Sequence, residues 1–481
     1  MEERLLLPKE PDSADLKNRV WDESKKLWAI AFPGIVARVT SFGMIVVTQL
    51  FIGHLGELDL AAFGLQQSIL LRFVNGILIG MSSATETLCG QAYGAGHYRM
   101  MGIYLQRSWI IDGVTATILL PLFIFAAPIL KLIGQQEDIA IEAGKISLWS
   151  IPILYYMVFS LTIQMYLQAQ QKNQIVAWLS AISFSVHVFL SWLFVVKLGL
   201  GLPGAMSAFI ISGWALVIAE LVYIFGGWCP NTWCGFTKAA FSDMLPLAKL
   251  SISSGVMICL ELWYNSVLVL LAGYMKNATV ALSAFSICLN INGWQFMICL
   301  GFLGSSCVRV SNELGRGNAQ AAKFAIKVVL ATSAIIGIIF WILCLVFSRQ
   351  MAYLFTSNEE IAETVSRLHV LLAFSMLLNG IYPVLSGVAV GAGVQSTVAY
   401  INLGSYYVIG VPIGILLGYV AHLQVTGLWI GLLSGVGVQT LLLSYLTWRT
   451  NWDEQVNKAA DRLGQFFIEP SKESDESSNL P

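Results

Sequence analysis

Long apolar stretches alternate with short polar ones along the chain. A helix needs about 20 consecutive apolar residues to cross the hydrocarbon core of a membrane, and the third and fourth stretches are long enough to include turns at the membrane surface as well. The pattern predicts an all-α integral membrane protein with twelve transmembrane helices. The runs lie near residues 27–52, 60–88, 103–133, 139–169, 174–197, 202–226, 247–274, 279–305, 322–348, 366–393, 396–420 and 425–448.

The composition agrees with a membrane protein and excludes other classes. Hydrophobic residues make up 57% of the chain and charged residues 11%, and the mean hydropathy is +0.72, whereas soluble domains carry about 25% charged residues. The net charge of -1 offers no basic surface to a nucleic acid. Cys229 and Cys234 have neither a second cysteine pair nor a nearby histidine, so no zinc site is expected.

Charged residues in the loops predict the orientation in the membrane. Lysine and arginine residues concentrate in residues 1–26 and in alternate loops, whereas the loops on the other side carry acidic pairs such as Glu57 with Asp59 and Glu137 with Asp138. Because basic loops stay in the cytoplasm, both termini are expected there. Residues 1–26 have the composition of a polar tail rather than of a cleavable signal.

Two stretches of the chain repeat each other. The loop "GQAYGAGHYRMMG" follows the second run and "SNELGRGNAQAAK" follows the eighth, so Gly94 and Gly96 correspond to Gly315 and Gly317, 221 residues further on. Because six crossings return the chain to the same side, the two copies must be parallel. We expect two pseudo-symmetric six-helix lobes with a central cleft. The expected division is a cytoplasmic N-terminal tail (1–26), an N-lobe (27–226), a cytoplasmic linker (227–246), a C-lobe (247–448) and a cytoplasmic C-terminal tail (449–481).

Several motifs carry a family resemblance. The stretches "IGHLGELDLAAFG", "ETLCGQAYGAG", "RVSNELGRGN" and "LSGVAVGAGVQ" resemble the plant branch of the multidrug and toxic compound extrusion (MATE) transporters, over about residues 20–450. The stretch "LNINGWQFMICLGF" is closest to detoxification-type members that include flavonoid carriers. The resemblance implies a transporter and not an enzyme. It would export xenobiotics or secondary metabolites, flavonoid-like or cationic, from the cytosol by alternating access, driven by protons without any cofactor.

One acidic residue, Glu261 in "MICLELWYN", lies near the middle of the seventh run. Acids inside a membrane are usually functional, and burial disfavours the charged form of a carboxyl group. We therefore expect Glu261 to bind and release the coupled proton. The family resemblance agrees, because a glutamate at this place is a proposed proton site in plant members and "CLELWYN" matches it.

Polar residues at helical spacing in the seventh, eighth and tenth runs predict a shared cavity in the C-lobe. Some plant relatives have an aspartate where this chain has Asn379. Asparagine cannot carry a proton, so the resemblance implies that coupling here rests mainly on Glu261. The candidates for the substrate cavity are Arg38, Tyr264, Asn265, Ser286, Asn290, Asn379 and Tyr382.

Arg38 lies too deep in the first run to reach the membrane surface comfortably. It either meets a phenolate, carboxylate or glucuronide group of the substrate, acts as a counter-ion to Glu261, or pairs with carbonyl groups freed by Pro33. Glu86 belongs to the "ETLCGQAYGA" signature and is expected to have a structural or gating role. Pro33 and Pro383 lie inside runs, where a kink could act as a hinge.

Two further acids, Asp112 and Glu220, lie within a few turns of the cytoplasmic ends of their runs. At such positions acidic side chains usually reach the aqueous interface, where their charge is solvated. We therefore expect both to be interfacial anchors rather than parts of the site.

Two functions remain open from the sequence. The first is the proton-driven antiporter; the alternative is a proton-independent facilitated transporter or channel for polar metabolites, in which Glu261 only shapes the pore. An enzyme is not expected, because the loops carry no HExxH, P-loop or GxSxG motif. The start "MEERLLLP" has the spacing of an acidic dileucine signal, which would direct the protein to the vacuolar membrane, but it can equally be a hydrophobic patch without a sorting role. The vacuolar membrane and the plasma membrane therefore both remain open. The expected partners are protons, small organic substrates and the lipid bilayer, for a monomeric protein.

Overall fold

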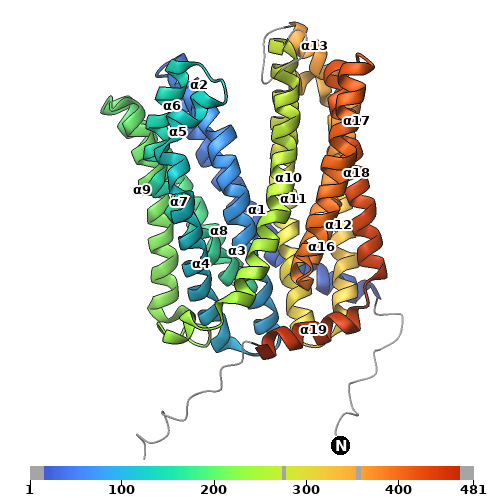
Figure 1. Cartoon of the computed structure of the whole chain (residues 1–481). Coiled ribbons are helices and arrows are strands. Elements are labelled where there is room, and N and C mark those ends of the chain that lie inside the picture. The colour runs from blue at the N-terminus through green and yellow to red at the C-terminus, as the bar shows by residue number, and fades with distance from the viewer. Residues whose placement is uncertain (1–15, 274–277, 354–358, 466–481) are drawn as a thin grey trace, which may run out of the picture.

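Helices form most of the described chain, which in this computed structural model comprises residues 16–273, 278–353 and 359–465. Twelve spans among these residues are long and apolar enough to cross a membrane, which confirms the predicted number (Figure 1). They are formed by α1 (Leu16–Gly53), α2 (Glu57–Gln66) with α3 (Arg72–Gly94), α4 (Tyr98–Ile124), α7 (Ile151–Ala169), α8 (Asn173–Ser191), α9 (Gly201–Tyr223), α10 (Met244–Gly273), α11 (Ala278–Gly315), α12 (Ala319–Tyr353), α14 (His369–Asn379) with α15 (Tyr382–Ala392), α16 (Gln395–Asn402) with α17 (Val411–Ile415), and α18 (Gln424–Arg449).

Short helices lie between some of these spans. The third apolar run breaks at Phe125 into α4 and α5 (Ala126–Leu132), and the fourth run begins with α6 (Glu137–Trp149) ahead of α7. The turns expected in these two long runs are therefore present. Two more short helices, α13 (Glu359–Arg367) and α19 (Trp452–Gln465), precede the tenth span and follow the last one.

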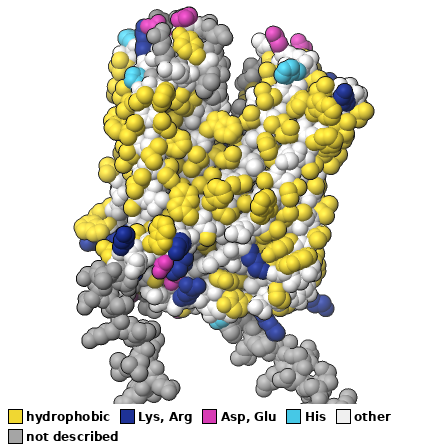
Figure 2. Space-filling model, turned by 180° about the vertical axis from the view of Figure 1, so that it is seen from behind, with side chains coloured by type: hydrophobic (Ala, Val, Ile, Leu, Met, Phe, Trp, Pro, Cys, Tyr) yellow, Lys and Arg dark blue, Asp and Glu magenta, His cyan; other side chains and the backbone are white. Residues whose placement is uncertain are grey.

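The helices pack as two bundles that diverge toward one end of the molecule (Figure 1). A notch separates the bundles at the end that carries α2 and α13, and they meet at the end from which the chain termini leave (Figure 2). Two long helices join the bundles, because α1 packs on α11 and α10 packs on α3. Leu27 and Ala31 of α1 share an apolar cluster with Phe302 of α11. The first half of α1 thus supports the opposite lobe.

The two repeated loops have the same backbone conformation. Gly96 follows α3 with φ +78°, and Gly317 follows α11 with φ +79°. The amides of His97 and Asn318 each donate across the turn, at 2.9 Å, to a carbonyl five residues earlier. This is the Schellman motif, which ends a helix with a glycine in the left-handed region. The sequence repeat therefore corresponds to a structural repeat.

Glycines at equivalent positions let the two lobes touch at the end near the termini. A Cβ atom at Gly94 would overlap the carbonyl of Asn312, and one at Gly315 would overlap the carbonyl of Gln91. Because Gln91 and Asn312 are themselves 221 residues apart, the two contacts are related by the pseudo-two-fold axis. The closed end is thus held by backbone contacts that leave no space for a side chain.

Helices cross or lie beyond three of the expected domain boundaries. Residues 16–26 continue α1 instead of forming a tail, α10 begins at Met244, and α19 lies within the expected C-terminal tail. The extra turns of α1 are charged, but Glu23 is buried in an ion pair with Arg309 of α11 at 2.7 Å, so packing on the other lobe stabilises them. The dileucine start and the tail after residue 465 lie outside the described residues.

Helix α19 contacts both lobes at the closed end. Trp452, Ala459 and Leu463 bury one of its faces. The guanidinium of Arg462 donates at 3.4 Å to the side chain of Gln91 on α3 and at 3.4 Å to the carbonyl of Gly393 after α15. Burial lowers the pKa of Arg462, although an arginine stays protonated at any physiological pH. The helix therefore bridges the two lobes in this conformation.

We expect Arg462→Ala to lower the thermal stability of the protein by a few degrees. The variant loses two hydrogen bonds from a charged donor, together about 1–2 kcal/mol. Tryptophan fluorescence of the detergent-solubilised protein during heating measures the change. Lys458→Ala is the matched control, because Lys458 lies on the same helix with half of its side chain exposed. Equal melting temperatures for the two variants would contradict a bridging role for Arg462.

Candidate functional site

Glu261 lies in the middle of α10, where its side chain is partly buried. The hydroxyl of Tyr382, the first residue of α15, donates a hydrogen bond to its carboxylate. Within the described part of the chain, no basic side chain forms an ion pair with Glu261. A carboxyl group held by a neutral hydroxyl can take up a proton without breaking an ion pair.

The tenth span is broken beside this carboxyl group. Helix α14 ends at Asn379 and α15 begins at Tyr382, with Pro383 in its first turn. Proline lacks the amide that would continue the hydrogen-bond ladder of the preceding helix. Pro383, predicted as a hinge, therefore lies at a helix break, whereas α1 continues through Pro33.

Asn379 belongs to a cluster of side-chain amides. It donates to Oδ1 of Asn292 at 2.9 Å and to Oε1 of Gln295 at 2.8 Å, both on α11. Gln295 in turn donates to the carbonyl of Met376 at 3.1 Å. These bonds occupy the Asn379 amide nitrogen and tie α14 to α11. In place of an acid, this position supplies a neutral link between two helices of the C-lobe.

Tyr264 lies in the core of the C-lobe, which corrects its assignment to the substrate cavity. Its side chain is 1% exposed, stacks on Tyr406 at 4.5 Å and donates to the carbonyl of Gly431 at 2.8 Å. Although it follows Glu261 by less than one helical turn, its ring is directed at α18 and the segment before α17. Packing within the lobe therefore accounts for this residue.

The remaining C-lobe candidates have different surroundings. Asn265 is partly buried, and its amide makes a long contact of 3.5 Å with the carbonyl of Glu261. Asn290 on α11 is exposed. The side chain of Ser286 lies outside the described part of the structure. Asn265 is thus placed next to Glu261 on the same helix.

Glu86 and Arg38 lie where the two lobes meet. Glu86 is 3% exposed, and the thiol of Cys307 on α11 donates a hydrogen bond to its carboxylate. The charge that attracts Arg38 is this same carboxylate. The counter-ion of Arg38 is therefore Glu86, and the alternative pairing with Glu261 is not formed.

The interfacial role expected for Asp112 and Glu220 is wrong. Asp112 is 1% exposed and accepts a hydrogen bond from Ser82 at 2.8 Å; Glu220 is fully buried and accepts one from Gln164 at 3.1 Å. Both acids are therefore inside the N-lobe and are held by neutral donors. Their positions near the ends of apolar runs did not reveal that neighbouring helices cover them.

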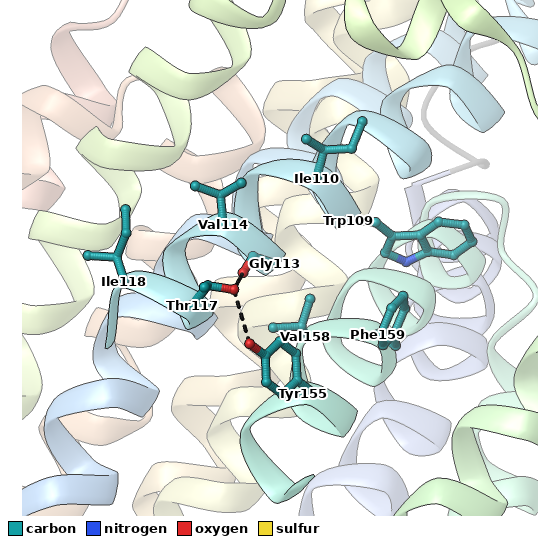
Figure 3. Close-up of a pocket in the computed structure, with 9 residues that line it drawn as sticks. All are labelled: Trp109, Ile110, Gly113, Val114, Thr117, Ile118, Tyr155, Val158 and Phe159. Carbon is teal, nitrogen blue, oxygen red and sulfur yellow. Dashed lines mark hydrogen bonds between the residues drawn. The ribbon is translucent and has the colours of Figure 1, made fainter. Parts of the chain in front are cut away.

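One cavity lies away from these residues. It is a groove of about 480 Å³ between α4 and α7, with a hydrogen bond of 3.0 Å between Thr117 and Tyr155 (Figure 3). Val114 and Ile118 on its rim are 55% and 71% exposed, and its lining includes no acidic or basic side chain. The groove opens on the outer surface of the N-lobe and offers no group for proton binding.

Two residues at the lobe interface were not predicted. Cys307 could have been found from the repeat, because it follows Glu86 by 221 positions and the two meet at the pseudo-two-fold axis. Gln168 on α7 lines a small cavity with Arg38, and nothing in the sequence pattern marked it. Across the described ranges, no group of three or more His, Cys, Asp or Glu side chains could hold a metal ion.

Known proteins resemble this chain in both sequence and fold. The MatE family model matches residues 33–193 and 254–416, and the two matches begin 221 residues apart, as in the repeat. Protein DETOXIFICATION 24 of Arabidopsis thaliana is 52% identical over 98% of this chain and 96% of its own length, and DETOXIFICATION 25 is 52% identical over 97% and 95%.

Solved structures of MATE transporters have the same fold as this chain. The eukaryotic MATE transporter AtDTX14 superposes with a TM-score of 0.87 at 33% identity, over 92% of this chain and 99% of that one. A MATE in the bent conformation has a TM-score of 0.80 at 18% identity, over 94% and 100%, and shows the shared fold. The chain therefore belongs to the multidrug and toxic compound extrusion (MATE) family of membrane transporters.

Proposed function

We propose that this transporter is a proton-coupled antiporter that exports xenobiotics or secondary metabolites, flavonoid-like or cationic, from the cytosol. The observation that carries the proposal is the Glu261 carboxyl group, which lies within a membrane-spanning helix, is bound by the Tyr382 hydroxyl and has no basic partner among the described residues. Such a group can bind a proton at modest cost. A coupling residue needs this property.

The two-lobed arrangement supports alternating access. The lobes are in contact at the end near the termini, through Gly94 and Gly315, and are separated by a notch at the other end (Figure 2). Rocking of one repeat against the other would exchange the open and closed ends. The break before Pro383 lies beside Glu261, so protonation and helix movement could be coupled there. Glu86 would act at the gate, where it contacts Cys307.

Competition between the proton and the substrate for one carboxyl group would couple proton movement to substrate transport. If substrate binding favours deprotonated Glu261 and protonation favours release, each occupant lowers the affinity for the other. One pH unit supplies about 1.4 kcal/mol per proton, and a potential of 100 mV supplies about 2.3 kcal/mol per charge. These terms are large enough to concentrate a substrate against its gradient.

The charge distribution supports an orientation with both termini in the cytoplasm. Most Lys and Arg side chains in the view of Figure 2 gather at the end near the termini, and most Asp and Glu side chains lie at the opposite end. Cytoplasmic loops of membrane proteins carry the excess of basic residues. The notch would then open to the vacuolar lumen or the cell exterior, and the protein would act as a monomer in either membrane.

Uptake into vesicles of the reconstituted protein tests this function. With the vesicle interior more acidic than the medium, we expect fluorescent organic substrates to accumulate inside, and accumulation should stop when an ionophore collapses the pH gradient. Protein-free vesicles carrying the same gradient are the control for passive trapping. Equilibration at the same rate with and without the gradient would instead favour the facilitated transporter.

A further inference from the structure

Arg38 lies near the middle of α1, and its guanidinium has no hydrogen-bond acceptor in the described part of the protein. Among the described residues, none accepts a hydrogen bond from its guanidinium, and the only charge acting on it is that of Glu86. The expected pairing with carbonyl groups near Pro33 is therefore not formed in the described chain. A guanidinium has five N–H donors, and a charge inside a membrane is costly unless it is compensated.

The Arg38 side chain lines a small polar cavity between the lobes. The cavity has a volume of about 10 Å³, which is about the space of one water molecule. Gln168 of α7 and Ser305 of α11 form other parts of its wall. A Cβ atom at Gly304, also in the wall, would lie 3.6 Å from Oε1 of Gln168 and 3.8 Å from Oε1 of Glu86. The missing side chain therefore leaves polar atoms of both lobes facing one small space.

Glu86 does not accept the hydrogen bonds that the Arg38 guanidinium can donate. The two side chains attract each other, but no contact ion pair joins them, and one carboxylate oxygen of Glu86 has no hydrogen-bond partner in the described chain. The carboxylate of Glu86 interacts with the thiol of Cys307. Arg38 thus has an anion nearby but none bound, which distinguishes it from Arg309, whose guanidinium is held by Glu23 at 2.7 Å.

An aromatic pair lies one helical turn from Arg38, on the side of the notch. Phe42 follows Arg38 by four residues, a rise of about 6 Å along the helix, and its ring meets Trp294 of α11 edge to face at 4.9 Å. Trp294 is 39% exposed. Because this pair joins the two lobes, it must separate when the lobes move apart, and its rings would then be free to pack on a planar solute.

We propose that Arg38 binds the anionic group of the transported compound, and that the substrate is a planar aromatic molecule bearing a carboxylate. This inference rests on the proposed transport function and assigns the substrate class. A guanidinium pairs with a carboxylate through two parallel hydrogen bonds, and Phe42 with Trp294 supplies aromatic surface about one turn away. The substrate would therefore be recognised by its acid group and its ring together.

The substrate binds when the lobes separate at the end near the termini, because the cavity in the present conformation holds about one water molecule. Separation draws Glu86 away from Cys307 and opens the space beside Arg38. The carboxylate of the substrate then takes the place of Glu86 as the anion closest to Arg38. When the substrate leaves and the lobes close, Glu86 compensates Arg38 again. The cation is never left buried without an anion, which would be strongly unfavourable.

Binding of a matched pair of compounds tests the proposal. The probes are a flavonol glucuronide and its methyl ester, which differ in the carboxylate alone, and equilibrium dialysis against the detergent-solubilised protein measures their affinities. We expect the wild-type protein to prefer the acid by roughly 10- to 100-fold. Arg38→Gln should lose this preference and still bind the ester, whereas Arg38→Lys should keep part of it. Arg367→Gln is the control, because Arg367 is an exposed arginine on α13.

Several outcomes would overturn the assignment. Equal affinities for the acid and the ester in the wild type would exclude recognition of the carboxylate, and an equal loss of both in Arg38→Gln would make Arg38 a structural residue. If chloride at cellular concentration abolished the preference, the cavity would hold an inorganic ion only. The binding assay needs no gradient, so preference for the acid without gradient-driven uptake would refute the proposed function alone. Gradient-driven uptake without preference would refute this inference alone.

Discussion

Replacing Glu261 by glutamine is expected to abolish gradient-driven uptake and to leave the fold intact. The amide has nearly the shape of the acid and can still accept a hydrogen bond from Tyr382, but it cannot exchange a proton. Since Asn379 is already an amide, neither Glu261→Gln nor Asn379 would then supply a carboxyl group. We expect uptake driven by an inside-acid gradient to fall by about tenfold or more, to the level of protein-free vesicles.

Two further variants make this prediction specific to the proton. Glu261→Asp keeps a titratable group and should retain part of the uptake, although the shorter side chain weakens the contact with Tyr382. Glu363→Gln removes an exposed acid of α13 that is paired with Arg367 and should behave as the wild type. Substrate binding in detergent should persist in Glu261→Gln. Undiminished gradient-driven uptake in that variant would remove Glu261 from the coupling mechanism.

The sequence predicts those features of the fold that the membrane imposes. A lipid-facing helix must be apolar over its whole length, so runs such as 322–348 locate spans such as α12 to within a few residues. The repeat is equally visible, because a backbone with positive φ favours glycine and therefore preserves Gly96 and Gly317 at matching points. Both signals depend on local chemistry, which a single sequence contains.

Features that depend on packing between distant segments could not be predicted in the same way. Polar spacing predicted that the helix faces carrying Glu261 and Tyr382 share a cavity, but it did not predict that the Tyr382 hydroxyl is the partner of the Glu261 carboxylate. Tyr264 was misassigned because its distance from Glu261 along the helix does not determine which neighbour covers its ring. Helix α19 was not predicted, because its exposed face is charged. An amphipathic surface helix of this kind contains no long apolar run.

The partners and the exposure of charged residues inside the membrane could not be predicted from the sequence either. The position of Arg38 deep in an apolar run predicted that its charge would be energetically costly. Which acid lies near it depends on how the two lobes meet, and in the fold this acid is Glu86. Asp112 was expected at the interface from the same measure of depth, and helix α3 covers it through Ser82. Position along a helix gives depth in the membrane, whereas exposure depends on all of the neighbouring helices.

Replacing Gly94 by valine is expected to prevent closure of the end near the termini. The new side chain would overlap the carbonyl of Asn312 on the other lobe, and overpacking of this kind costs about 1–3 kcal/mol or more. The overlap exists only while the lobes are in contact, so the variant should still fold and should favour the conformation in which this end is open. We expect transport to fall by about tenfold, because each 1.4 kcal/mol changes an equilibrium by about a factor of ten.

The thiol of Cys307 reports the position of the lobes in this variant. It is fully buried against Glu86 in the closed interface, so a maleimide should label it faster in Gly94→Val than in the wild type, after the exposed Cys234 has been replaced in both. Gly437→Val is the matched control, because nothing lies within 4 Å of a Cβ atom at that helical glycine. Unchanged labelling of Cys307, together with normal transport, would show that the contact between Gly94 and Asn312 is not required for the transport cycle.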